Sequence, residues 1–298
     1  MSEADKTPRH WDTFLDSPHD ARSLDDASVV LLPVPYDSTT SYRTGSRYGP
    51  KAIITASRQL EDYDIELDRD ISEVGIYTAA EIEADVSGPE AMVRRIEHVV
   101  RPLAETGKLV GVLGGEHTVT IGAVRAFRDV HADLSVLYFD AHADLRDQYM
   151  GSPWSHACVA RRVAETTPLV EVGVRSMSAE ERVFADSKPV PIWYWPAAGG
   201  DVHDIANWAL EGLSENVYVS IDLDVLDPSL MAAVGTPEPG GMGWSDLTVL
   251  LRAVAGSRRI VGFDITELSP PEGPEACAFT AAKLAYKLIG YVTEGATT

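Results

Sequence analysis

The sequence predicts an α/β fold in which helices cover both faces of a mostly parallel sheet of about eight strands. Short apolar runs alternate along the chain with segments of helical length, which is the pattern of α/β proteins. The apolar runs also show little alternation between apolar and polar residues. Such runs are typical of strands that are buried on both faces, as the strands of a parallel sheet are.

Seven apolar runs have the length and composition of strands, and a shorter eighth run is similar to them. We expect strands at residues 29–33, 74–77, 109–113, 134–139, 169–174, 217–221 and 260–265. The eighth run covers residues 190–194. The apolar composition of these runs places them in the interior of the fold.

Seven segments between these runs are expected to be helices, namely 89–104, 119–128, 156–166, 179–186, 202–212, 245–255 and 276–290. In the first of them, Met92, Val93, Ile96, Val99, Val100 and Leu103 recur at helical spacing. No repeat, low-complexity tract or linker divides the chain. We therefore expect one domain over residues 28–298, preceded by a polar, loosely packed extension over residues 1–27.

The acidic composition argues against some classes of partner. The 298 residues include 46 acidic and 25 basic ones, which gives a formal net charge of −21. Such a surface would be repelled by a nucleic acid or an anionic membrane, so we expect neither as a partner. No apolar run approaches the roughly 18 to 20 residues of a membrane span.

The composition also predicts the cellular location of the protein and the salt adaptation of its surface. The first 28 residues contain no apolar signal core, and two cysteines give no disulfide framework, so we expect a cytoplasmic protein. The acidic surplus, with only 6 lysines among the basic residues, favours a halophilic, salt-adapted surface. The alternative is an ordinary acidic cytosolic protein.

Polar side chains follow four of the expected strands. His117 follows the run 109–113, and Glu267 follows 260–265. Asp140 to Asp144 follow 134–139, and Asp222 with Asp224 follow 217–221. Sites in open parallel sheets form beyond the carboxyl ends of the strands, so we expect these side chains on one side of the molecule.

The spacing of these polar residues is suited to chelation. Asp140, His142 and Asp144 are separated by two residues each, and an extended chain directs all three to one face. Asp222 and Asp224 have the same spacing. His117 follows two glycines, which permit a tight turn. A lone histidine is more often hydrogen-bonded than a ligand, and a lone aspartate more often caps a helix, but the joint pattern favours a site.

The predicted ligand set suits a pair of divalent cations. It consists of His117, Asp140, His142, Asp144, Asp222 and Asp224. Imidazoles and carboxylates without cysteine favour Mn²⁺ over Zn²⁺. Four ionised aspartates carry about four negative charges at neutral pH, which two divalent ions would cancel and one would not. We therefore expect two Mn²⁺ ions about 3.5–4 Å apart, bridged by carboxylate oxygens and a water.

The motifs, in this order, resemble those of the ureohydrolases, the family of arginases and agmatinases. The similar stretches are "PYDSTTSYRTGSRYGPKAI" (35–53), "GGEHT" (114–118), "DAHAD" (140–144), "SIDLDVLDP" (220–228) and "GTPEPGG" (235–241), the last being typical of agmatinases. The resemblance covers residues 30–290. It implies a three-layer α/β/α fold, a two-manganese centre holding the six residues above, and a homotrimer or homohexamer.

The resemblance also implies roles for individual residues. Asp222, together with Asp140 or Asp144, would bridge the two ions. His156 would shuttle protons; the alternative is that it only begins a helix capped by Ser155. Glu267 would receive the substrate guanidinium. Water activated by the metals would attack the guanidino carbon, and Asp144 or His156 would protonate the departing amine, giving urea and an amine.

The substrate tail is less closely defined by the sequence. The stretch 145–156 has no asparagine, which disfavours arginine relative to agmatine. Asp147, Glu238 or Tyr149 could bind the ammonium of agmatine or of N1-aminopropylagmatine, whereas Arg146 would favour 4-guanidinobutanoate. The alternatives are therefore a guanidinobutyrase, an arginase or a formimidoylglutamase. A catalytically inactive metal-binding relative is the alternative from another class.

Three residues depart from the family pattern. Glu116 and Thr118 replace the usual aspartate and serine beside His117. Gly273 stands where the family often has an aspartate, in a loop one residue shorter. We expect Glu116 to change the hydrogen bonds around the ligands and Gly273 to affect the surroundings of Glu267.

Overall fold

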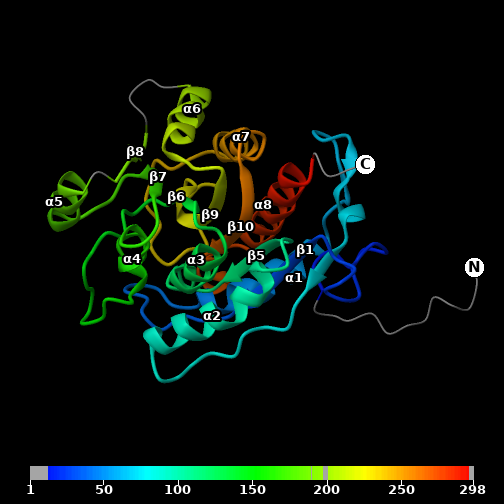
Figure 1. The fold of residues 1–298 in the computed structure, drawn as a ribbon, viewed down its shortest axis with the longest axis horizontal. Helices are drawn as coiled ribbons and strands as arrows, with labels where there is room; N and C mark the ends of the chain where they lie inside the picture. Colours follow the sequence, from blue (N-terminus) through cyan, green and yellow to red (C-terminus); the bar gives the residue numbers. More distant parts are fainter. Residues whose placement is uncertain (1–12, 189, 197–200, 295–298) are drawn as a thin grey trace, which may run out of the picture.

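A computed structural model describes residues 13–188, 190–196 and 201–294, and its centre is an eight-stranded sheet (Figure 1). The strand order is β4-β1-β5-β10-β9-β6-β7-β8, and all seven neighbouring pairs are parallel. The strands are β1 (Val29–Val34), β4 (Ile76–Thr78), β5 (Leu109–Gly114), β6 (Ser135–Phe139), β7 (Leu169–Val174), β8 (Ile192–Tyr194), β9 (Asn216–Asp222) and β10 (Arg259–Thr266). Each of the eight apolar runs overlaps one of these strands.

Helices cover both faces of this sheet and give it three layers. They are α1 (Gly49–Ser57), α2 (Pro89–Ala104), α3 (Val119–Val130), α4 (Val159–Ala164), α5 (Ala179–Ser187), α6 (Val202–Gly212), α7 (Trp244–Ala255) and α8 (Ala276–Val292). The predicted three-layer fold with a parallel sheet is confirmed. Within the described ranges, no helix is long and apolar enough to cross a membrane.

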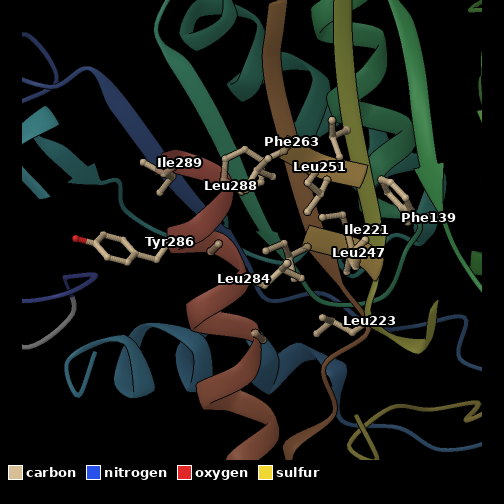
Figure 2. Close-up of a cluster of buried hydrophobic side chains, with 14 of the residues drawn as sticks. Phe139, Ile221, Leu223, Leu247, Leu251, Phe263, Leu284, Tyr286, Leu288 and Ile289 are labelled. Carbon is tan, nitrogen blue, oxygen red and sulfur yellow. The ribbon is translucent and has the colours of Figure 1, made fainter. Parts of the chain in front are cut away.

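Two apolar clusters join these layers. One contains Ile53 of α1, Ile205 of α6, Leu247 of α7 and Leu284 of α8, packed against one face of the sheet. Figure 2 shows part of it, where Leu247 and Leu284 lie close to Ile221 of β9. The other cluster contains residues of α2, α3, α4 and α5 on the opposite face. Because both faces are covered, the strands contain apolar residues throughout.

Several short elements were not predicted. Helix α1 begins within the motif 35–53 and ends at Ser57, and a hairpin pairs β2 (Tyr63–Asp64) with β3 (Arg69–Asp70). The 3-10 helices are η2 (Ser46–Tyr48), η3 (Ile71–Val74), η4 (His156–Cys158), η5 (Leu223–Val225) and η6 (Pro270–Glu272). The hairpin has only two residues per strand, and Lys287 of α8 binds Asp64 at 2.9 Å. Its stability therefore depends on a contact that is distant in sequence.

The expectation of a loosely packed N-terminal extension is wrong for residues 13–27. Phe14 is fully buried, its backbone N–H donates to Thr78 Oγ1 at 2.9 Å, and that of Leu15 donates to Ser57 Oγ at 2.9 Å. One aromatic side chain in a polar segment is sufficient to attach it to the core. Residues 1–12 lie outside the described residues.

The order of the strands determines where the predicted site residues meet. Strands β5, β10, β9 and β6 are adjacent at the centre of the sheet. These are the four strands after which the polar residues follow, and because they are parallel, their carboxyl ends share one edge.

Candidate metal centre

His117 is placed by a tight connection between β5 and α3. The backbone N–H of Gly115 donates to Val34 O at 2.9 Å, and a Cβ at Gly115 would overlap the carbonyl oxygen of Tyr36. Only glycine allows this close approach of two backbones. The turn directs His117, which is 1% exposed, toward the end of the sheet.

The Nδ1 atom of His117 lies among three carboxylates. It is 3.1 Å from Asp140 Oδ2, 3.2 Å from Asp222 Oδ2 and 3.7 Å from Asp144 Oδ2. These aspartates follow β6 and end β9, two strands that pair directly. His117, Asp140 and Asp144 form the first group with the geometry to hold a cation.

A second group shares Asp140 with the first. The Nδ1 atom of His142 is 3.0 Å from Asp224 Oδ2 and 3.5 Å from Asp140 Oδ1. Asp140, His142 and Asp224 each offer a ligand atom within 4.8 Å of the others. Five of the six predicted residues thus form two groups with Asp140 in common, and Asp222, 3.2 Å from His117 Nδ1, lies beside the first group.

The electrostatics of these groups fit a positive ligand. Burial, reinforced by the charge of Asp140, raises the pKa of Asp144 well above its usual range. Burial, reinforced by Asp224, does the same to the pKa of Asp222. Asp140 Oδ2 is buried with no hydrogen-bond partner. Carboxylates in such surroundings need cationic compensation, and the donor set of imidazole and carboxylate suits divalent metals.

Residues that were not predicted orient His117 through its Nε2 atom, on the ring edge opposite the carboxylates. Its Nε2 lies 2.8 Å from Ser220 Oγ, and Ser220 donates to Asp264 Oδ1 at 2.8 Å. The buried Asp264 also accepts hydrogen bonds from Thr120 and Tyr218. Because Ser220 donates to Asp264, its oxygen accepts from the Nε2–H of His117, which leaves Nδ1 directed at the carboxylates. Ser220 precedes Asp222 by two residues, a spacing that could have identified it.

Glu267 and His156 lie next to this centre. Glu267 Oε1 accepts a hydrogen bond from the backbone N–H of His117 at 2.7 Å, and His156 Nδ1 lies 3.9 Å from the same oxygen. Both Glu267 (φ 66°) and Asp144 (φ 49°) have left-handed backbones, which are uncommon for residues other than glycine and frequent at functional sites. Burial lowers the pKa of His156 to about 4.

His156 both begins a short helix and lines the cavity of the site. It begins η4, and the side chain of Ser155 caps this 3-10 helix by accepting from Ala157 N. The side chain of His156 also lines the cavity of the site. The helix cap at Ser155 therefore positions the imidazole of His156 at the cavity.

The departures from the family pattern have structural partners. Glu116 is fully buried, and its side chain accepts hydrogen bonds from Ser38 N, Thr39 N and Thr39 Oγ1 at 2.7–2.9 Å. Thr39 Oγ1 accepts in turn from the backbone N–H of His156 at 2.9 Å. Thr118 Oγ1 donates to Trp154 O at 3.2 Å. At Gly273, a Cβ would lie 2.7 Å from Ala233 N, so the short loop requires glycine.

A cavity of about 230 Å³ opens above the site. Asp144, His156 and Asp222 line it, together with Arg146, Tyr149, Ser176, Ser178, Glu181 and Thr236. Of the predicted tail-binding residues, Tyr149 lines the cavity and Glu238 Oε1 lies 3.7 Å from His142 Nε2. Asp147 instead pairs with Arg162 at 2.8 Å.

Comparison with known proteins identifies the family. A model of the arginase family matches residues 27–290. The N(1)-aminopropylagmatine ureohydrolase of Synechocystis sp. is 40% identical over 280 residues, 90% of each chain. The agmatinase of Pyrococcus horikoshii is 38% identical over 90% of this chain and 93% of its own. The crystal structure of agmatine ureohydrolase from Thermoplasma volcanium has a TM-score of 0.87 and 31% identity, covering 96% of this chain and 95% of that one.

These similarities confirm the predicted membership of the ureohydrolases and the similarity to agmatinases. They extend over nearly the whole chain and include both candidate cation-binding groups. The chain therefore belongs to the arginase family, and it is a hydrolase.

Proposed function

We propose that this protein is a binuclear manganese hydrolase that cleaves the guanidino group of agmatine or N1-aminopropylagmatine to urea and putrescine or the corresponding polyamine. The observation that carries the proposal is the pair of cation-binding groups beside Glu267, in a chain of the arginase family. None of the six predicted ligands is missing, which argues against an inactive relative.

Two Mn²⁺ ions would be held by the six residues. His117, Asp140 and Asp144 would bind one ion, and Asp140, His142 and Asp224 the other. Asp140 is common to both groups, which supports it over Asp144 as a bridging ligand. Asp222, 3.2 Å from His117 Nδ1, is the second candidate bridge. When bound, a pair of divalent cations lowers the pKa of water and so supplies hydroxide near neutral pH.

The residues of the chain itself would bind and orient the substrate. The Glu267 carboxylate is 5% exposed and can accept a paired, charge-assisted contact from a planar guanidinium. Holding this group beside the cation sites orients its carbon for attack. Asp144 and His156 line the cavity of about 230 Å³, and either could carry a proton to the departing amine.

The outer wall of the cavity favours a cationic tail. Arg146 stacks over Tyr149 at 4.8 Å, and its Nε lies 3.8 Å from Glu181 Oε2. Because Glu181 compensates the charge of Arg146, this arginine is a poor partner for a carboxylate tail. Glu238 adds a negative charge near His142. This charge supports agmatine and N1-aminopropylagmatine over 4-guanidinobutanoate, as do the names of the relatives.

Urea release tests this function. Metal-free protein, reloaded with Mn²⁺, would be given agmatine, N1-aminopropylagmatine, arginine and 4-guanidinobutanoate, at low and high salt. We expect activity only after reloading, with one of the two guanidino-amines turned over fastest. Full activity of the metal-free protein would contradict the mechanism, and fastest turnover of arginine would contradict the substrate assignment.

The resemblance also supports two proposals beyond the site. We propose a homotrimer or homohexamer, which light scattering coupled to size-exclusion chromatography would measure. A cytoplasmic location is the second, and it agrees with the reducing compartment that the two cysteines indicate.

A further inference from the structure

Tyr138 lies within the candidate metal centre although its residue type did not mark it as a site residue. It is a fully buried residue of β6, two positions before Asp140. Its phenol donates a hydrogen bond to Asp144 Oδ2 at 2.8 Å. The phenol oxygen also lies 3.0 Å from His117 Nδ1. One hydroxyl group thus contacts two of the proposed ligands.

The ring of Tyr138 makes a further contact with His117. The two rings are stacked with centroids 4.6 Å apart and planes inclined by 4°. Ser220 holds the opposite edge of the imidazole through Nε2 at 2.8 Å. The position of His117 is therefore fixed by stacking and hydrogen bonding, whether or not the phenol oxygen is present.

Asp144 depends more strongly on the phenol. Its backbone is left-handed (φ 49°), a conformation that an aspartate adopts at some energetic cost. Its carboxylate oxygen Oδ2 is held by Tyr138 on one side, while the residue lines the cavity on the other. The single hydrogen of the phenol is donated to Asp144 and not to His117 Nδ1, so the lone pair of that nitrogen remains available for a cation.

We infer that Tyr138 is a positioning residue of the metal centre, whose phenol holds Asp144 and strengthens cation binding at the group His117, Asp140 and Asp144. The inference rests on the proposed function, because it requires the proposed cations. Within the part of the chain that the structure describes, the phenol makes no hydrogen bond to the second group, Asp140, His142 and Asp224. Removal of the hydroxyl should therefore affect the two cation-binding events unequally.

Calorimetric titration of metal-free protein with Mn²⁺ tests this asymmetry. The variant Tyr138→Phe removes one oxygen and keeps the stacked ring. Loss of a hydrogen bond that orients a metal ligand typically weakens metal binding about 10–100-fold. We expect one of the two Mn²⁺ ions to bind Tyr138→Phe at least tenfold more weakly and the other to bind within about twofold of its wild-type affinity.

Tyr286→Phe is the matched control. Tyr286 of α8 is also fully buried, but its phenol donates to the backbone oxygen of Asp62 and to none of the proposed ligands. This variant should bind both ions as the wild type does. Unchanged binding of both ions by Tyr138→Phe, or equal weakening of both, would overturn the inference. Failure of the wild-type protein to bind Mn²⁺ would instead contradict the proposed function.

A measurement on the wild type covers the case in which Tyr138→Phe does not fold. In metal-free protein labelled with ¹³Cζ-tyrosine, slow exchange of the phenolic hydrogen appears as a deuterium isotope shift of Cζ. We expect such a shift for Tyr138, and Asp144→Ala should abolish it. A rapidly exchanging hydroxyl at Tyr138 in the wild type would overturn the inference.

Discussion

Glu267 is joined directly to His117, because its Oε1 atom accepts the backbone N–H of His117 at 2.7 Å. The proposed guanidinium acceptor and a proposed metal ligand thus share one rigid contact between β10 and the connection after β5. A guanidinium held by Glu267 would therefore be positioned relative to the proposed cations by the backbone of the protein.

Replacing Glu267 by glutamine should separate binding of substrate from binding of metal. Glu267→Gln loses the charge that attracts and orients a guanidinium, so kcat/KM should fall by about 10²–10³-fold. The content of Mn²⁺ should remain that of the wild type. Steady-state kinetics and metal analysis measure the two quantities, with Glu211→Gln on the exposed face of α6 as the control. A Glu267→Gln enzyme with wild-type kinetics would exclude this role.

Thr39 should affect catalysis through His156. Its hydroxyl joins Glu116 to the backbone N–H of His156. Thr39→Val removes the hydroxyl, and since a hydrogen bond contributes about 0.5–1.5 kcal/mol, kcat should fall about 3–10-fold with KM little changed. Thr39→Ser keeps the hydroxyl and should retain nearly full kcat. If the serine variant is as slow as the valine variant, the hydroxyl is not what positions His156.

Glu238 should determine the preference for a cationic tail. Its Oε1 lies 3.7 Å from His142 Nε2 and the side chain is 36% exposed, so its charge is partly screened. Glu238→Gln should raise KM for agmatine about three- to fivefold and leave KM for 4-guanidinobutanoate unchanged or lower. Mn²⁺ affinity is measured in parallel, because His142 is a proposed ligand. Equal changes of KM for both substrates would argue against a role in tail recognition.

Glu171 should make stability depend on pH. This residue of β7 is fully buried, and neither carboxylate oxygen has a hydrogen-bond partner. Burial raises its pKa well above 4.5, and the charges of Asp140, Asp144 and Glu181 add to this shift. Above the ordinary pKa, the folded protein then holds a proton that the unfolded chain has lost, so the free energy of unfolding falls as pH rises.

The variant Glu171→Gln cannot lose this proton. Relative to the wild type, its free energy of unfolding should increase between pH 5 and 8, by up to about 1.4 kcal/mol per pH unit within the window of titration. Urea denaturation with saturating Mn²⁺ measures this difference, and Glu215→Gln before β9 is the exposed control. A constant difference between wild type and Glu171→Gln across this range would contradict a buried neutral carboxyl.

The six proposed ligands could be predicted because their signals are local. Asp140, His142 and Asp144 have a chelating spacing directly after an apolar run, and parallel strands place such ends together. The contacts between the residues that support them gave no local signal, although Ser220 and Glu116 each stand close to a proposed ligand in the sequence. Ser220 and Asp264 meet only because β10 lies beside β9, and Glu116 reaches Thr39 only because β5 lies beside β1.

The roles of Phe14 and Tyr138 could not be predicted from the sequence, because they depend on contacts that form only in the folded chain. Phe14 is one apolar residue in a polar segment, and only the groove that receives it distinguishes it from an exposed residue. Tyr138 lies in the apolar run 134–139, and only the folded chain places Asp144 and His117 around its phenol. The salt-adapted surface stays a prediction from composition.

The central claim is that Asp140 is shared by two cation sites, and anomalous diffraction from crystals soaked in Mn²⁺ tests it most directly. We expect two manganese peaks per chain about 3.5–4 Å apart, one beside His117 and Asp144 and the other beside His142 and Asp224, with Asp140 between them. Peaks elsewhere, or no peak at Asp140 in crystals saturated with Mn²⁺, would contradict it.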